Sequence, residues 1–374
     1  MIFFHRMIHK LFFLLLPLLL VTSLNIIGQE NSLNYLFKAG ENGYKCFRIP
    51  TIIKTKNEVI IAFAEGRKRN CGDSDDIDLV MRRSMDGGKT WSPLIVIWDD
   101  GGNTCGNPAP VVDRNSGKLI LLSTWNLGTD HEQQIINQES KDSRRIYLLQ
   151  SIDDGLTWSI PKEITSDVKL ANWTWYATGP VNGIQIRNGQ HKGRLIIPCD
   201  HIEAGTKKYF SHVIFSDDGG NNWRLGGTTL SDQVNESTIV ELDKGRLLLN
   251  MRNYNNLRYR QTSLSYDGGL SWTKLVQDNG LPEPVCQGSL IRLWSSGKKP
   301  IVVFSNPSSQ VKRENMTVKW SYDLGRTWTK SALIHAGPSA YSNLLELSKG
   351  EIGILFEGGQ KNAYEGIAWK TLRF

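Results

Sequence analysis

The chain has 374 residues and a formal net charge of +7, with 22% charged and 40% hydrophobic residues. These proportions are those of an ordinary globular protein, and they exclude a disordered chain, a collagen and a coiled coil. The length allows one large all-β domain or two smaller domains. Five cysteines are too few for a disulfide-rich scaffold of this size.

The first predicted element is an N-terminal export signal. Arg6 and Lys10 precede an apolar run at 11–21, and small or polar residues follow it. A spanning helix needs about 20 apolar residues, so this shorter run is typical of a cleaved secretory signal. We predict a signal peptide over residues 1–28, with an uncleaved anchor as the alternative. The mature protein is then exported and has no stable membrane insertion.

Charge and cysteine spacing limit the partners of the mature chain. Removing residues 1–28 takes away two positive charges and leaves +5, with Lys and Arg scattered along the sequence. Basic runs and a basic helix are lacking, so we predict no nucleic-acid partner. The cysteines show no Cys-x-x-Cys spacing, which argues against structural zinc. In an exported chain they allow one or two disulfides, and the spacing does not say which pairs form.

A short pattern, Ser-x-Asp-x-Gly-x-(Thr/Ser/Asn)-Trp, recurs along the chain, and we call each copy an Asp box. Four fixed residues match by accident at roughly 10⁻⁵ of positions. A β-like run precedes each copy, and Asp with Gly supplies the turn that a hairpin needs. Because a catalytic group is needed once and a fold element in every repeat, we interpret the boxes as structural. The five copies begin at Ser84, Ser151, Ser216, Ser265 and Ser321.

The spacing of the boxes predicts the architecture. The copies lie about 59 residues apart on average, so the mature chain holds about six units. Short apolar runs bounded by Gly, Asn, Asp or Pro fill the intervals, and helical periodicity never exceeds a turn or two. We predict an all-β, six-bladed β-propeller over residues 29–374, a single domain with its site on the central axis.

The motif Phe47-Arg48-Ile49-Pro50, followed by the Asp boxes, resembles the exo-α-sialidases (neuraminidases) of the bacterial and animal type, over residues 40–374. The resemblance implies a sialidase-like propeller that removes terminal α-linked sialic acids from glycoconjugates. Its partners are then sialylated glycans, it needs no metal or organic cofactor, and it acts as a monomer. It also implies a retaining reaction through a covalent tyrosyl intermediate.

The family binds the substrate carboxylate with three arginines from different blades. The matching positions are Arg48, Arg252 in Leu-Asn-Met-Arg, and Arg313. A guanidinium group stays charged and presents a planar fork, so several of them can hold one carboxylate. Glu357, in Leu-Phe-Glu-Gly, matches the glutamate that orients the first arginine.

The resemblance assigns the nucleophile to Tyr341, in Gly-Pro-Ser-Ala-Tyr-Ser, and its base to Glu236, in Asn-Glu-Ser-Thr. A sialoside carries a carboxylate at its anomeric carbon, so a carboxylate nucleophile would meet like-charge repulsion, which a neutral phenol avoids. Tyrosine ordinarily titrates near pH 10, so a neighbouring base has to activate it.

Asp73 is the predicted acid/base for the glycosidic oxygen, with Asp75 as the alternative. Four carboxylates crowd this segment, and like charges are expected to raise the pKa of an acid catalyst. A calcium loop is the competing interpretation, but Ile77 and the absence of the loop glycine break its pattern.

Further pocket positions follow from the resemblance. Arg67 and Asn107 resemble contacts to the sugar O4 and acylamino region, Glu65 braces Arg67, and Gln287 resembles a glycerol-side contact. Trp125 is either a wall of the N-acyl pocket or a core residue. Two other functions stay open: a sialic-acid-binding propeller without catalysis, and a trans-sialidase-type enzyme of the same fold. A lectin has no need for the three predicted catalytic residues together.

Overall fold

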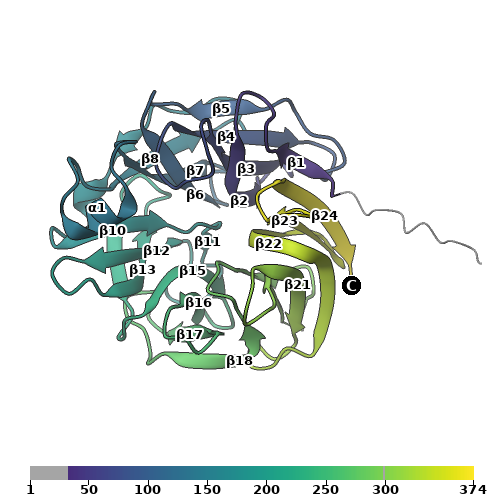
Figure 1. The fold of residues 1–374 in the computed structure, drawn as a ribbon. Helices are drawn as coiled ribbons and strands as arrows, with labels where there is room; N and C mark the ends of the chain where they lie inside the picture. Colours follow the sequence, from purple (N-terminus) through teal and green to yellow (C-terminus); the bar gives the residue numbers. More distant parts are fainter. Residues whose placement is uncertain (1–32, 298–299) are drawn as a thin grey trace, which may run out of the picture. The chain divides into compact units, whose positions relative to one another are not determined.

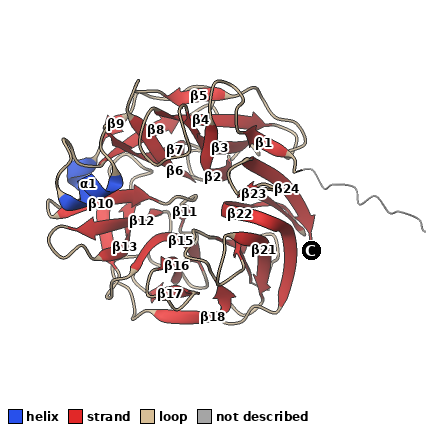
Figure 2. Ribbon diagram, in the orientation of Figure 1, coloured by secondary structure: helices blue, strands red, loops and turns tan. Residues whose placement is uncertain are grey.

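The computed structural model describes residues 33–297 and 300–374, and the predicted signal peptide at 1–28 lies outside them. Nearly all regular structure in the described part is β-strand (Figure 2), so the all-β prediction is confirmed. Two short helices occur, α1 (Glu132–Asn137) and α2 (Thr165–Val168). Neither of these described helices is long and apolar enough to cross a membrane.

Hydrogen bonding divides the strands into four sheets. The first holds β2 (Cys46–Lys54), β3 (Ile60–Arg67), β4 (Ile77–Ser84), β5 (Ile95–Trp98), β6 (Thr104–Val112), β7 (Leu119–Asn126), β8 (Arg145–Ser151) and β9 (Lys162–Glu163). The second holds β10 (Trp173–Thr178), β11 (Ile184–Gln185), β12 (Leu195–Glu203), β13 (Tyr209–Ser216) and β14 (Arg224–Thr228). All their pairings are antiparallel except one parallel pair, Ile77 with Thr104, which joins β4 to β6.

The other two sheets complete the described chain. The third holds β15 (Val234–Glu241), β16 (Leu247–Asn253), β17 (Tyr259–Ser265) and β18 (Val276–Pro282). The fourth holds β19 (Ser289–Leu293), β20 (Ile301–Pro307), β21 (Glu314–Ser321), β22 (Lys330–Ser348), β23 (Glu351–Gly358), β24 (Gly366–Arg373) and β1 (Tyr35–Lys38). Since β1 pairs with β24, the first described strand is bonded to the last.

The sheets follow one another around a common centre, with β2, β6, β11, β15 and β22 nearest to it (Figure 1). Apolar side chains fill the spaces between neighbouring groups of strands. One cluster joins Leu122 of β7 to Ile197 of β12, and another joins Ala62 of β3 to Trp369 of β24. Inner strands are therefore buried on both faces, as in β3, where all the residues are buried. This explains why their sequences read as continuous apolar runs rather than alternating ones.

The Asp boxes form the same turn each time. Every copy begins at the last residue of a strand, namely β4, β8, β13, β17 or β21. The box serine Oγ accepts the backbone N–H of the box glycine at 2.8–2.9 Å in all five copies. The aspartate Oδ1 accepts N–H groups of its own turn, as from Thr90 to Asp86 at 2.9 Å. These carboxylates stabilise their own turns by hydrogen bonding, in agreement with the structural interpretation.

Candidate active site

One pocket gathers most of the predicted site residues. Its volume is about 200 Å³, and three larger hollows, of about 690, 600 and 580 Å³, contain none of them. The predicted residues that line it are Arg48, Glu65, Arg67, Asp73, Asn107, Glu236, Arg252, Arg313 and Tyr341.

Four strands near the centre carry a β-bulge or ladder irregularity at a candidate residue. The pairing register shifts between Arg48 and Thr51 in β2, Gly106 and Ala109 in β6, Val234 and Ser237 in β15, and Ser339 and Ser342 in β22. The residues at these four shifts include Arg48, Asn107, Glu236 and Tyr341. A bulge bends its strand and re-aims a side chain, so it turns these side chains out of a regular ladder. The pocket is thus built from the ladder irregularities of strands that are otherwise buried.

Glu357 on β23 orients the first arginine. Its Oε1 accepts hydrogen bonds from Arg48 Nε at 2.7 Å and from the backbone N–H of Ile49 at 2.9 Å. Its Oε2 accepts the backbone N–H of Tyr341 at 3.1 Å. Burial by itself lowers the pKa of Arg48, but the electrostatic effects of Glu357 and of the neighbouring Tyr364, Tyr341 and Asp73 together outweigh it, and the pKa is raised well above the ordinary value. The guanidinium group therefore stays charged although it is buried.

The other two arginines differ in how they are neutralised. Arg252 Nη1 contacts Glu236 Oε2 at 2.6 Å and donates to Tyr341 Oη at 3.1 Å. Arg313 donates only to neutral oxygens, the Val285 carbonyl at 3.0 Å and Tyr364 Oη at 3.3 Å. Among the residues that the structure describes, no ion pair neutralises Arg313. Its charge is available to an anion in the pocket.

Tyr341 and Glu236 are hydrogen-bonded to each other in the pocket lining. The phenol donates to Glu236 Oε1 at 2.5 Å. Burial, and then the charge of Glu236, raise the pKa of Tyr341 well above its ordinary value, against the opposing effect of Arg252, Arg313 and Arg48. The phenol is accordingly neutral before substrate binds, and its proton already points to a carboxylate that can accept it.

Asp73 lies on the loop between β3 and β4, at the mouth of the pocket. Its Oδ1 is 2.8 Å from Arg67 Nη1 and 3.8 Å from Arg48 Nη1, and the side chain is 63% exposed. Burial favours a higher pKa, but Arg67 and then Arg48 outweigh it and lower the pKa of Asp73. The expectation that neighbouring carboxylates raise this pKa is therefore wrong, because two arginines face Asp73.

The remaining carboxylates of this segment face elsewhere. Asp75 lies 3.4 Å from Arg69 and does not line the pocket. In the described part of the chain, Asp76, Asp78 and Asp99 are the group close enough to hold a metal ion. The ammonium group of Lys68 lies 2.9–3.3 Å from all three of them. A lysine already supplies the positive charge there, which argues against the calcium-loop interpretation.

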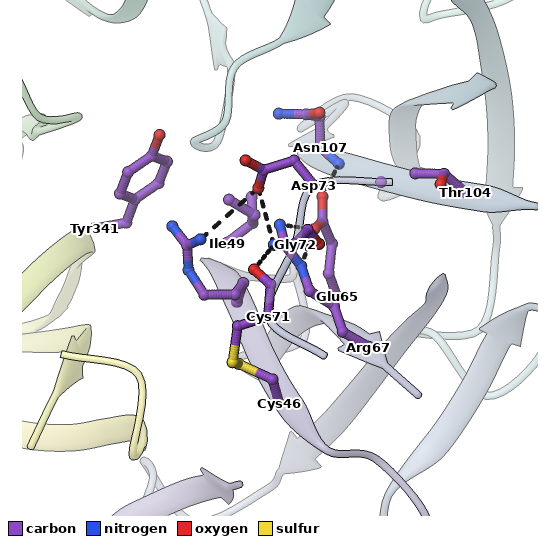
Figure 3. Close-up of polar contacts among 12 residues, drawn as sticks. Cys46, Ile49, Glu65, Arg67, Cys71, Gly72, Asp73, Thr104, Asn107 and Tyr341 are labelled. Atoms are coloured by element: carbon purple, nitrogen blue, oxygen red, sulfur yellow. Dashed lines mark hydrogen bonds and ion pairs between the residues drawn. A yellow bond between two sulfur atoms is a disulfide. The ribbon is translucent and has the colours of Figure 1, made fainter. Parts of the chain in front are cut away.

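Glu65 holds two neighbours in place. Its Oε2 accepts two hydrogen bonds from Arg67, at 3.0 and 2.6 Å, and its Oε1 accepts the backbone N–H of Asn107 at 2.8 Å. Asn107 has a positive φ of 52°, and its side-chain oxygen accepts from Arg144. Figure 3 shows Glu65, Arg67 and Asp73 as one contiguous polar group beside Asn107.

Two predicted contacts lie away from the pocket. Gln287 is buried and bonds three backbone groups. Its Nε2 donates to the carbonyl oxygens of Pro180 and Ser342, both at 3.0 Å, and its Oε1 accepts the backbone N–H of Ser342 at 2.9 Å. Gln287 is not among the residues that line the pocket, and its glycerol-side contact stays a prediction. Trp125 packs against Tyr147 and donates to Asp100, which fits the core alternative rather than a pocket wall.

The sequence motifs missed one half of the pocket. Its further lining includes Glu132 of α1, Arg144, Trp175 of β10 and Asp200 of β12. Arg144 stacks on Trp175, with its Cζ 4.0 Å from the ring centroid. Asp200 was signalled only by being a charged residue in the apolar run Leu195–Glu203. Glu132 begins the short helix α1 and Arg144 lies in the loop before β8, and no sequence pattern distinguished either residue.

Asp200 is a buried carboxyl group without a partner. It is 1% exposed, and its Oδ1 accepts no hydrogen bond among the described residues. Burial, and then the charges of Glu236 and Glu132, raise its pKa well above the ordinary value. The pocket thus combines an arginine side with a side that holds a neutral carboxylic acid.

Comparison with known proteins assigns the family. Residues 58–354 match the model of the BNR repeat-like domain. The chain is 31% identical to a sialidase of Micromonospora viridifaciens over 346 residues, 88% of this chain and 53% of that protein, so it spans about half of that relative. It is 32% identical to an exo-alpha-sialidase of Aspergillus fumigatus over 362 residues, 88% of this chain and 84% of that protein.

A solved structure agrees with these relatives. The Hadza microbial sialidase Hz136 superposes with a TM-score of 0.82 at 29% identity, over 91% of this chain and 68% of that one. The chain belongs to the sialidase family. The family prediction is confirmed.

The state of Asp200 gives a prediction for stability. Its pKa is higher in the folded than in the unfolded chain, so the folded state holds a proton that the unfolded chain releases above pH of about 4. Stability is then lost as the pH rises toward the folded pKa. We expect Asp200→Asn to remove this loss, so that its Tm advantage over the wild type grows between pH 4 and 8 in thermal scans. A Tm difference that stays constant over this range contradicts a neutral Asp200.

Proposed function

We propose that this protein is a retaining exo-α-sialidase that hydrolyses terminal α-linked sialic acids of glycoproteins, glycolipids and oligosaccharides. The observation that carries the proposal is the 2.5 Å contact between the Tyr341 hydroxyl and Glu236 Oε1, inside a pocket whose lining includes all three predicted carboxylate-binding arginines. A neutral phenol that is hydrogen-bonded to a base suits attack on an anomeric carbon whose carboxylate substituent is negatively charged. Membership of the sialidase family supports the same substrate class.

The substrate carboxylate binds to Arg48, Arg252 and Arg313. Glu357 and Glu236 already partner the first two, so the third positive charge is left for the ligand. Charge-assisted hydrogen bonds from several guanidinium groups fix both the position and the orientation of a carboxylate. This places the anomeric carbon, to which the carboxylate is attached, next to the Tyr341 hydroxyl.

The reaction proceeds in two displacements. Tyr341 Oη attacks the anomeric carbon while Glu236 takes its proton, and Asp73 gives a proton to the departing glycosidic oxygen. Water, deprotonated by Asp73, then attacks the sialyl-tyrosine, and the phenol leaves with the proton returned by Glu236. Two inversions give net retention. No step uses a metal or an organic cofactor.

Asp73 must be protonated to act as the acid, although its arginine neighbours lower its pKa at rest. A substrate carboxylate bound to Arg48 adds a negative charge beside Asp73 and occupies one of those neighbours. Nearby negative charge favours the protonated form of a carboxyl group. Substrate binding therefore raises the pKa of Asp73 in the step that needs its proton.

We further propose that the described domain has six blades. The first sheet divides at the single parallel pair between β4 and β6 into β2–β5 and β6–β9. In the fourth sheet, β22 pairs with β21 through Lys330–Pro338 and with β23 through Ser339–Ser348. Dividing β22 there gives one blade of β19–β21 with the first part of β22. The last blade holds the rest of β22, β23, β24 and β1.

Export and a monomeric state belong to the same proposal. The structure contains a disulfide, Cys46–Cys71, and such bonds persist in oxidising compartments outside the cytosol. Residues 1–28 then act as the signal peptide, and the domain runs from 29 to 374. A monomer suffices because every proposed catalytic side chain comes from one chain.

Release of free sialic acid tests the proposal. With sialyllactose we expect the wild type to release the free sugar, and Tyr341→Phe to lower kcat by roughly 10³-fold or more, because the nucleophile is lost. Tyr322→Phe, an exposed tyrosine far from the pocket, serves as the matched control and keeps wild-type activity. Binding without any release favours a lectin, and a transferred or anhydro product, identified by NMR, favours a trans-sialidase-type enzyme.

The third arginine gives a second test. We expect Arg313→Ala to lower kcat/KM by roughly 10- to 150-fold, the equivalent of one hydrogen bond to a charged group, with little change in Tm. The neighbouring Lys312 is exposed, so Lys312→Ala is the matched control and leaves kcat/KM unchanged. Equal effects of the two substitutions mean that Arg313 does not bind the substrate.

A further inference from the structure

The disulfide Cys46–Cys71 lies beside the pocket and joins two of its parts. Cys46 is the first residue of β2 and lies two residues before Arg48, while Cys71 lies two residues before Asp73. Their Cα atoms are 5.4 Å apart. Figure 3 shows the bond directly below the group formed by Arg67, Gly72 and Asp73. The covalent link thus runs from the strand of the carboxylate-binding arginine to the loop of the acid.

The loop has few other attachments on this side. Residues 68–76 contain no strand, and Cys71, Gly72 and Asp73 are exposed. Arg67 Nη1 donates to the carbonyl oxygens of Cys71 and Gly72 at 2.6 and 2.7 Å, and it also contacts Asp73. At the far end the loop is held by Thr104, which bonds the backbone of Asp75 at 2.9 and 3.1 Å. Near Asp73, therefore, the loop is held by the Arg67 guanidinium group, by the contact of Ser74 Oγ with His131 Nδ1 at 2.5 Å, and by the disulfide.

The ion pair with Arg67 and the disulfide respond differently to protonation of Asp73. The ion pair between Arg67 and Asp73 weakens when Asp73 takes up the proton that it must later donate, because the carboxyl group is then neutral. A covalent S–S bond does not depend on that charge. An acid catalyst contributes only while it stays within hydrogen-bond reach of the leaving oxygen.

We propose that Cys46 and Cys71 are positioning residues, whose disulfide keeps Asp73 at the pocket in its protonated state and so makes acid catalysis dependent on an oxidised chain. The inference rests on the proposed sialidase function and deepens it. Cys46 is fully buried, whereas Cys71 is at the surface, so a soluble reductant reaches the bond from the loop side. Activity then falls when the bond is reduced to two thiols by an added dithiol.

The test compares two substrates that differ in their need for an acid. A sialoside of 4-nitrophenol has a leaving group that departs as an anion, whereas the sugar alcohol of sialyllactose needs a proton. We expect Cys46→Ser/Cys71→Ser to lower kcat for sialyllactose by about tenfold or more, given the 10²–10⁴-fold worth of a general acid. For the nitrophenyl substrate the loss is less than threefold, and KM for both changes little because the arginines remain.

Controls separate positioning from stability. Dithiothreitol lowers wild-type activity on sialyllactose in the same way and has no effect on the double variant. Cys105→Ala removes a buried free thiol and keeps wild-type rates on both substrates. Circular dichroism checks that each sample is folded at the assay temperature. If the double variant does not fold, the reduced wild type is compared with the oxidised wild type on the two substrates instead.

The outcomes distinguish this inference from the function on which it rests. Equal losses on the two substrates, or no loss on either, overturn the positioning role while the sialidase activity of the oxidised wild type stands. Absence of turnover by the oxidised wild type on both substrates overturns the sialidase function and the positioning role with it.

Discussion

A single buried carboxylate, that of Glu357, connects the parts of the pocket that lie furthest apart in the chain. It accepts hydrogen bonds from Arg48 and Ile49 on β2 and from the backbone of Tyr341 on β22. The residues it joins are about 300 positions apart, and they come together because β1 pairs with β24 and brings the two ends of the domain side by side. Glu357 is fully buried, so removing it would leave the charge of Arg48 without its partner. The closure of the strand groups and the geometry of the site thus depend on the same contact.

The titratable groups of the pocket are held in different protonation states. Burial and Glu236 keep the Tyr341 phenol neutral, two arginines keep Asp73 ionised, and burial keeps Asp200 neutral. Under the proposed function, a ligand carboxylate shifts this balance, because it adds negative charge beside Arg313, which forms no ion pair among the described residues. On this proposal, the residues proposed to react are arranged to respond to the charge of the substrate.

The sequence allowed prediction of much of this arrangement. The Asp boxes identified the strand ends correctly, because the same serine and aspartate close the same turn in each copy. Motif positions such as Arg252 and Glu236 share the pocket, since the resemblance covers nearly the whole chain. Asp200 was missed because it belongs to no motif, and a buried strand such as β12 reads as core. The pKa of Asp73 was misjudged because sequence neighbours need not face one another, and Arg67 lies closer to it than the other carboxylates do. The pairing of Cys46 with Cys71 also depends on three-dimensional proximity.

The most direct test of the mechanism is to identify the residue that carries the covalent sialyl group. A sialoside with fluorine at C3 destabilises the oxocarbenium-like transition state and slows the breakdown of a glycosyl-enzyme. After incubation with such a sialoside and digestion, mass spectrometry is expected to find the added sugar on the peptide that contains Tyr341, and none in Tyr341→Phe. A sugar attached to another residue, or an inverted product from an enzyme that never becomes labelled, would contradict the account.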